Sequence, residues 1–133
     1  MMTVGKREKG QNLVEFALIL PLFLLLVIGM AEFGRAWMLK NILTGAAREA
    51  VRAAAVLPKA DACDNAKAIA DPILDSAGIP PLVCAGGGVT TSDAPVPIVS
   101  VTTKYDYSPI TGFIPGLASF ELTGTATMRR ERD

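Results

Sequence analysis

The sequence predicts an α+β protein in which a long N-terminal helix packs against a small antiparallel sheet of two or three strands. An uncharged apolar run, Phe16 to Ala31, predicts the first half of that helix. Sequence rich in alanine and leucine, without proline, continues the helix to Leu57. Beyond Pro97, apolar and polar residues alternate with period two, which predicts strands. The chain of 133 residues therefore has room for one membrane segment and one small domain.

Composition excludes several classes of function. Lys plus Arg and Asp plus Glu balance at 13 each, so nothing supports a nucleic-acid partner. Histidine is absent and there are only 2 cysteines, so neither a zinc cluster nor a His-based catalytic set can be assembled. We expect no enzyme, no metal, no cofactor and no small-molecule substrate.

A basic leader precedes the apolar run. Lys6, Arg7 and Lys9 keep this end cytoplasmic by the positive-inside rule, so the rest of the chain is exported. Gly10 ends the leader. A protease cut after Gly10 would leave a positive α-amine on Gln11, one helical turn from the carboxylate of Glu15.

Glu15 stands at the head of the apolar run and is the first candidate for a functional side chain. A charge at the centre of a membrane costs roughly 2.5–3.5 kcal/mol on insertion scales, so an acid in such a segment predicts a function. The α-amine of Gln11, in the same chain or in a neighbour, is the natural counter-charge. We therefore predict a processing site at Gly10 and Gln11 and a functional, paired carboxylate at Glu15.

Cleavage as a secretory signal peptide is the competing interpretation. The small residues Gly29 and Ala31 would then release everything from Glu32. The apolar run is longer than that of an ordinary signal peptide, and a signal peptide has no need of Glu15.

Pro21 and Trp37 each predict a local feature of the helix. Pro21 removes a backbone hydrogen bond and predicts a kink or a melted turn near Ala17 to Pro21. Trp37 fits either the aromatic belt at the membrane surface or the core side of an amphipathic helix.

The second half of the helix is predicted to be amphipathic. Lys40, Thr44, Arg48 and Arg52 recur every four residues and form a polar stripe. The opposite side carries the apolar residues Leu39, Ile42, Ala46, Ala50, Ala53 and Leu57. This apolar side can cover the chain's own domain, another helix, or both.

Pro58 ends the first helix, and short elements follow. A second helix is predicted around Asp64 to Ala70, with Asp71 and Pro72 starting one further turn up to Gly78. Extended residues Ile79 to Pro81 come next. Leu82 to Ala85 could form an edge strand, and the segment from Gly86 to Asp93 is predicted to be a loop.

Two strands are predicted at the C-terminal end, joined by a loop rich in proline and glycine over 108–117. The first has Val99, Val101, Thr103, Tyr105 and Tyr107 on one face, and the second has Phe120, Leu122, Gly124, Ala126 and Met128.

Cys63 and Cys84 are expected to form a disulfide, because both follow the membrane segment and would lie in an oxidising compartment. Closing a loop of about 22 residues is worth roughly 3 kcal/mol. Two inert thiols, or a redox pair lacking Cys-x-x-Cys spacing, are the alternatives.

The sequence also resembles a known family. The segments that carry the resemblance are Gly10 to Leu18, Leu20-Pro21, Glu32-Phe33-Gly34-Arg35, Ala47 to Arg52, and an exported region with two cysteines and a final strand that ends in Met128 to Glu131. These segments are similar to TadE-like proteins, the minor pseudopilins of tight-adherence (Tad, type IVc) pili.

The resemblance implies a pilin-like fold and a structural function. Gly10 would precede the bond cut by a prepilin peptidase, Gln11 would be the mature N-terminus, and Glu15 would guide the subunit into a filament used for adhesion and biofilm formation. Other pilins, pseudopilins and the inner-membrane assembly platform would be the partners. An unprocessed membrane-anchored periplasmic adaptor and a secreted soluble domain remain the alternatives.

The predicted organisation has four parts. Residues 1–10 are a cleaved cytoplasmic leader, 11–33 a transmembrane helix, 34–57 its periplasmic continuation, and 58–133 a disulfide-linked α+β domain. The protein would be a single-pass protein of the bacterial inner membrane.

Overall fold

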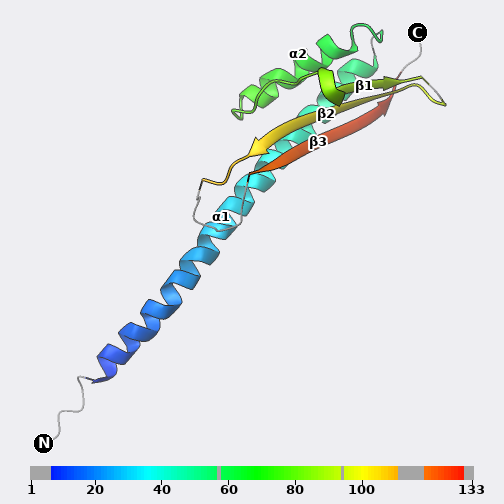
Figure 1. Ribbon diagram of the computed structural model, residues 1–133. Coiled ribbons are helices and arrows are strands. Elements are labelled where there is room, and N and C mark those ends of the chain that lie inside the picture. Colours follow the sequence, from blue (N-terminus) through cyan, green and yellow to red (C-terminus); the bar gives the residue numbers. More distant parts are fainter. Residues whose placement is uncertain (1–6, 57, 94, 111–118, 131–133) are drawn as a thin grey trace, which may run out of the picture. The chain divides into compact units, whose positions relative to one another are not determined.

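A computed structural model describes residues 7–56, 58–93, 95–110 and 119–130, with residues 7–9 described by their backbone alone (Figure 1). The elements are α1 (Arg7–Ala55), α2 (Ala62–Asp75), the 3₁₀ turn η1 (Ala85–Gly87), β1 (Val89–Ser92), β2 (Ile98–Tyr107) and β3 (Phe120–Arg129). This confirms the predicted α+β class, with one long N-terminal helix and a small antiparallel sheet. The chain divides into two compact units, Met1–Arg35 and Ala36–Asp133.

The first unit contains the N-terminal part of α1. The helix continues through Pro21 without a break, so the predicted melted turn near Ala17 is wrong. The large apolar side chains from Leu13 to Met30 are between 36% and 75% exposed. A helix satisfies its own backbone hydrogen bonds, and this is the form in which an exposed apolar segment can enter lipid.

The second unit begins with residues 36–55 of α1, whose buried face is broader than predicted. Leu39, Ala46 and Ala50 are buried as expected, and Ile42 and Ala53 are half-buried. The prediction missed Leu43, Ala47, Val51, Ala54 and Ala55, which are also buried. These residues share one core with the buried residues of α2 and the sheet, so two elements cover the helix where one was expected.

The C-terminal end of α1 and its polar stripe lie close to where the sequence predicted them. α1 ends at Ala55, shortly before Pro58, and Leu57 lies outside the described residues. Lys40, Arg48 and Arg52 are exposed, and Thr44 is half-buried. The second interpretation of Trp37, as a core residue, is wrong because its side chain is 61% exposed.

α2 is one continuous helix and not the two predicted segments. Pro72 lies inside it, and the helix continues to Asp75. Asp71 starts no new turn, because its Oδ1 accepts a hydrogen bond of 2.8 Å from the backbone N–H of Leu82. Ala62, Ala66, Ala70 and Leu74 are buried, so a strict i, i+4 stripe holds this helix in the core.

The sheet has the order β1-β2-β3 and is antiparallel throughout. The predicted face of β2 is confirmed, with Val99, Val101, Thr103 and Tyr107 buried and Tyr105 half-buried. Across the strand pair, Val101 faces Ala126 and Thr103 faces Gly124, so the predicted faces of the two strands coincide. The ends of the β3 face are exposed at Phe120 and Met128.

The third strand lies elsewhere than predicted. Leu82 to Ala85 forms no strand, because Leu82 is buried with its N–H bonded to Asp71 and Cys84 is tied to α2. The edge strand is β1, in the segment predicted to be a loop. Most of the predicted loop over 108–117 lies outside the described residues.

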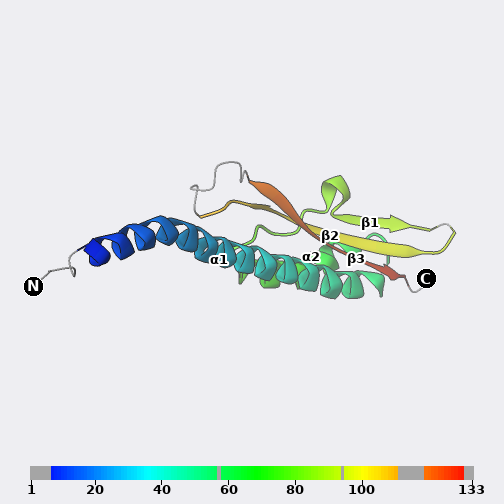
Figure 2. The same cartoon turned by 90° about the horizontal axis from the view of Figure 1, so that it is seen from below.

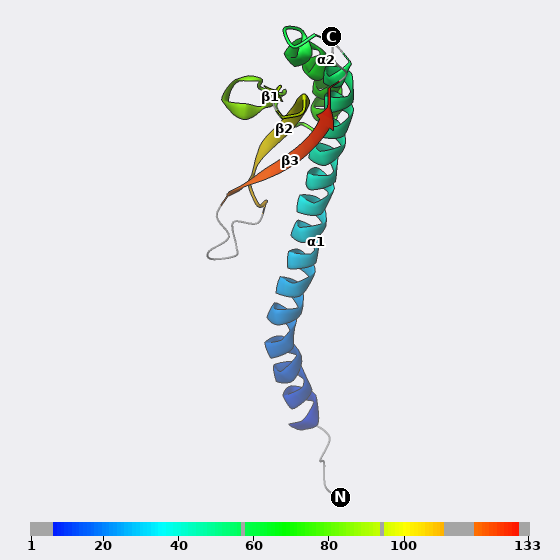
Figure 3. The same cartoon turned by 90° about the vertical axis from the view of Figure 1, so that its right-hand side faces the viewer.

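β3 is the strand nearest to α1, and β1 is the farthest (Figures 2 and 3). The contact is close at Gly124, where an added Cβ would lie 2.4 Å from the carbonyl carbon of Leu43, so only glycine fits there. The Thr103 hydroxyl donates to the Leu43 carbonyl at 3.0 Å, and the Lys40 ammonium donates to the Thr123 carbonyl. Helix and sheet are therefore joined by hydrogen bonds as well as by the core.

Candidate functional site

The predicted processing residues lie in the first turns of α1. Gly10, Gln11 and Glu15 are all helical and exposed. Gln11 and Glu15 are four residues apart, which places them on the same face of the helix. A Cβ added to Gly10 would meet nothing within 4 Å, so the fold of the chain does not itself require glycine at this position.

Glu15 is a carboxylate on an apolar surface. Its neighbours Leu13, Val14 and Phe16 are more than half exposed, at 68%, 62% and 61%. Gly10–Ala55 is long and apolar enough to cross a membrane. Among the residues whose side chains are described, none forms an ion pair with Glu15. In lipid, an unpaired carboxylate is costly.

Glu32 differs from Glu15 in its surroundings. Its side chain is buried, and its Oε2 lies 3.9 Å from Nη1 of Arg35, one helical turn later. The acid at the far end of the apolar run is thus paired within its own helix, while Glu15 at the near end is exposed.

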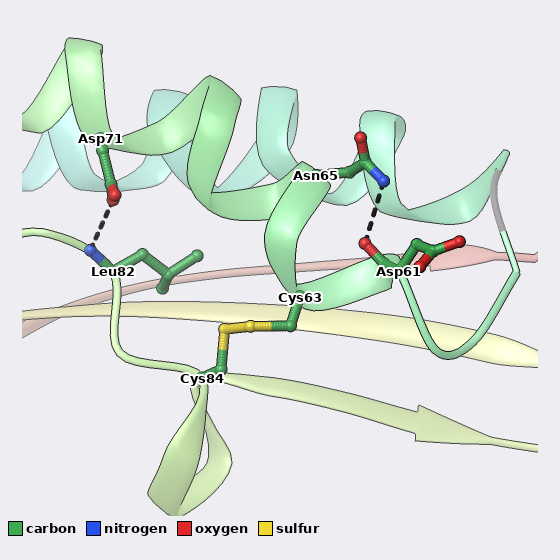
Figure 4. The surroundings of a disulfide bond; sticks show 6 residues. All are labelled: Asp61, Cys63, Asn65, Asp71, Leu82 and Cys84. Atoms are coloured by element: carbon green, nitrogen blue, oxygen red, sulfur yellow. Dashed lines mark hydrogen bonds between the residues drawn. A yellow bond between two sulfur atoms is a disulfide. The ribbon is translucent and has the colours of Figure 1, made fainter.

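The disulfide between Cys63 and Cys84 is confirmed, with Cα atoms 5.9 Å apart, and no described cysteine is free (Figure 4). It joins the first turn of α2 to the residue that precedes η1. Figure 4 also shows the hydrogen bond from Leu82 to Asp71. These two links fix the irregular segment between α2 and β1, which contains the positive-φ residues Gly78, Gly86 and Gly87. The alternative of two inert thiols is therefore wrong.

An ionic cluster at the far end of the sheet was not predicted. Asp93 accepts a hydrogen bond of 2.9 Å from Lys59 Nζ and one of 3.2 Å from Arg130 Nη2. The hydrogen bond and the charge of Lys59 lower the pKa of Asp93 from its ordinary value of 3.8; partial burial opposes this, and the charge of Arg130 adds to it. The three residues come from separate loops and strand ends, so no local pattern could have revealed the cluster.

The described residues offer no metal centre. No group of three or more Cys, Asp or Glu side chains in this part of the chain is placed to hold a metal ion. A groove of about 240 Å³ lies beside β2, with a mixed lining that includes Leu74, Pro81, Lys104 and Asp106. The charged residues that line this groove are exposed side chains of β2 and β3, so they lie at its surface.

Comparison with known protein families relates the N-terminal part of the chain to one of them. A family model described as TadE-like protein matches residues 10–52, whereas no curated protein and no solved structure matches the chain. The match begins at Gly10, contains Gln11, Glu15 and Glu32, and ends three residues before the end of α1. It includes no residue of α2 or the sheet. From residue 10 to residue 52 the chain is therefore similar to TadE-like proteins, as its sequence predicted.

Proposed function

We propose that the chain is a minor pseudopilin of a Tad (type IVc) pilus, with a role in the initiation or assembly of the filament. One observation carries the proposal: the TadE-like match covers an exposed apolar helix and begins at the glycine that sequence reasoning selected as the processing site. The activity is structural. The filament would serve adhesion and biofilm formation.

The proposed processing follows from the first turns of α1. A prepilin peptidase cuts between Gly10 and Gln11 and removes the leader, residues 1–10. The helix must unwind locally to expose this bond, and the ends of helices open more easily than their centres. The cut creates an α-amine on Gln11, which is positively charged near neutral pH.

Glu15 is the acceptor for that amine in the proposed assembly step. A carboxylate in lipid is expensive when it is alone and much less so when it forms a charge-assisted hydrogen bond. A neighbouring subunit that brings its own N-terminal amine to Glu15 removes this cost from both chains. The electrostatic gain would fix the axial position of one helix against the next.

The proposed pseudopilin role also assigns a location to each of the remaining segments of the chain. Residues 11–33 span the inner membrane with the N-terminus in the cytoplasm, and residues 34–57 continue the helix into the periplasm. Residues 58–133 form the exported domain, where a Cys63–Cys84 disulfide is chemically stable. This domain is an addition that a short major pilin would lack, which favours a minor role. Partners would be the peptidase, other pilins and pseudopilins, and the assembly platform.

The decisive experiment combines a deletion strain with the mass of the mature protein. Loss of the chain should reduce or abolish pili, and expression of the parent chain should restore them. The membrane-bound parent should begin at Gln11. An N-terminus at Met1 or Met2 would indicate an unprocessed adaptor, an N-terminus at Glu32 a secreted domain, and a normal number of pili in the deletion strain would refute the proposed function.

A further inference from the structure

The short strand β1 covers only part of the edge of β2 to which it is paired. β1 pairs with β2 from Ile98 to Val101, whereas β2 continues to Tyr107 (Figure 1). Just before β1, the C=O of Gly88 accepts a hydrogen bond of 2.7 Å from the N–H of Thr102. The chain reaches Gly88 from the 3₁₀ turn η1, and within the described ranges no strand pairs with this edge of β2 beyond Thr102.

The backbone groups of Lys104 and Asp106 point to this uncovered edge. In an antiparallel sheet, alternate residues of a strand direct both their N–H and their C=O to the same neighbouring strand. Thr102 bonds on the β1 side, so Lys104 and Asp106, two and four residues later, face that side as well. Two donors and two acceptors therefore stand in a row with the spacing of a β-strand.

The uncovered edge lies in the groove of about 240 Å³ beside β2. The lining of this groove combines residues 102–106 of β2 with several residues of the segment 80–88. The buried side chains of Leu74 and Leu82 contribute to it. An extended chain in the groove can therefore bond to the edge of β2 and direct a side chain toward an apolar surface.

The segment 80–88, which forms the wall beside this edge, is fixed in place by the domain itself. The Cys63–Cys84 disulfide and the hydrogen bond from the N–H of Leu82 to Asp71 attach it to α2 (Figure 4). A groove that is already formed loses little conformational freedom when it is filled.

The charges at the groove favour a basic occupant. Lys104 is paired with Glu121 at 3.3 Å. Asp106 is exposed and has no ion pair with any residue that the structure describes. A basic side chain directly opposite Asp106 on an added strand would form a cross-strand ion pair.

We propose that this edge of β2 binds an extended segment of another protein, which adds a short antiparallel strand in line with β1. The residues opposite Lys104 and Asp106 exchange backbone hydrogen bonds with them, and the one opposite Asp106 is basic. The residue between these two carries an apolar side chain on the face that Tyr105 shares. The occupant is an extended peptide because a second backbone in strand conformation matches a row of N–H and C=O groups at this spacing. The site belongs to the exported domain and is independent of the proposed processing and of Glu15.

The test uses the peptide acetyl-Thr-Val-Lys-Val-Lys-amide as the probe. Its lysines take the positions opposite Lys104 and Asp106, and the valine between them takes the inward position. The peptide is titrated into the ¹⁵N-labelled full-length chain in dodecylphosphocholine micelles, and NMR follows the backbone amides. We expect the amide signals of Lys104 and Asp106 to shift and their hydrogen exchange to slow. The amide of Ser100, which already faces β1, should change in neither respect.

Methylation of the peptide nitrogens distinguishes strand addition from unspecific adhesion. In antiparallel pairing, the N–H groups of the two lysines point to β2 and those of the valines point away. N-methylation of both lysines should abolish the shifts, and N-methylation of both valines should preserve them. Equal effects of the two modifications, or the reverse pattern, would overturn the proposal.

The role of charge is tested on the protein. Asp106→Asn should weaken binding of the peptide by about twofold to fivefold, as expected for an exposed ion pair. Asp64→Asn is the matched control, because Asp64 is an exposed acid of α2 outside the groove, and it should bind like the parent.

Three results would contradict the proposal. The first is the absence of shifts at Lys104 and Asp106 with the parent chain, and the second is equal binding by Asp106→Asn and the parent. The third is protection of both amides that rises with protein concentration before peptide is added, which would assign the edge to a second copy of the chain.

Discussion

Gly10 is the residue whose replacement tests processing most directly. A side chain there would meet nothing within 4 Å, so Gly10→Val should leave the helix and the exported domain unchanged. A tight protease cleft would exclude the new side chain. We expect full-length protein of unchanged level to accumulate in the membrane, as measured by intact mass.

Gly29→Val is the matched control, because Gly29 lies in the same helix and its Cβ position is equally open. This variant should be processed normally. Trimming of Gly10→Val to Gln11 at the parent's rate would show that the processing site is wrong.

Glu15 should matter for assembly and not for insertion. Glu15→Val removes a charge that costs roughly 2.5–3.5 kcal/mol at mid-membrane, so the variant should insert at least as well as the parent. It should nevertheless fail to enter filaments, because the amine of the neighbour has lost its acceptor. The measurement is the ratio of chain in sheared pili to chain in the membrane.

Glu15→Asp, which keeps the carboxylate, should retain part of this incorporation. Equal incorporation of Glu15→Val and the parent would remove Glu15 from the assembly mechanism.

At the scale of elements, the two faces of β2 should respond differently to charge. Val101 is fully buried between the sheet and the helices, and an uncompensated buried charge costs about 3–5 kcal/mol, a large share of the stability of a small domain. Val101→Asp should therefore unfold the exported domain and lower the protein level. Thr102 lies on the other face, where its half-buried side chain hydrogen-bonds to the hydroxyl of the exposed Thr125, so Thr102→Asp should be tolerated.

Limited proteolysis of membranes, followed by detection of the disulfide-linked domain, compares the two variants. The same protease resistance in both would contradict the assigned faces. Leu122→Asp should be milder than Val101→Asp, because Leu122 is only half-buried.

At the largest scale, Asp93 lies in the β1–β2 turn and connects the loop after the long helix to the end of β3. Its carboxylate is the one partner that the described residues provide for the Arg130 guanidinium, whose Nε and Nη1 are buried without hydrogen bonds in that part of the chain. Asp93→Asn should lower the melting temperature of the exported domain at neutral pH, because a buried cation loses its counter-charge.

The pH dependence has a defined sign. The pKa of Asp93 is lowered in the folded state, so the charged form stabilises the fold above the ordinary pKa of 3.8, and this contribution disappears as the pH falls through the lowered value. The melting temperatures of the parent and Asp93→Asn should therefore differ at pH 7 and converge only as the pH falls from 3.8 through the lowered pKa. A difference that persists unchanged in acid would mean that Asp93 acts by packing and not by charge.

Features that depend on local order along the chain could be predicted from the amino-acid sequence. The apolar run predicted the exposed helix, and period-two alternation predicted the inner faces of β2 and β3. The positions of Cys63 and Cys84 beyond the membrane segment predicted the disulfide. Gly10, Gln11 and Glu15 could be selected because their relation is one helical turn, and their roles stay predictions.

Features that depend on contacts between distant segments could be read only from the folded chain. Leu43 and Ala47 are buried because α2 and the sheet cover the same helix from two directions, which the periodicity of one helix cannot reveal. Asp71 accepts a hydrogen bond from the backbone N–H of Leu82 and does not cap a new helical turn. β1 forms where a loop was predicted, because the disulfide and the pairing with β2 hold this segment in place. The Lys59, Asp93 and Arg130 cluster joins residues 34 and 37 positions apart, and the free energy of such contacts depends on three-dimensional proximity, not on sequence spacing.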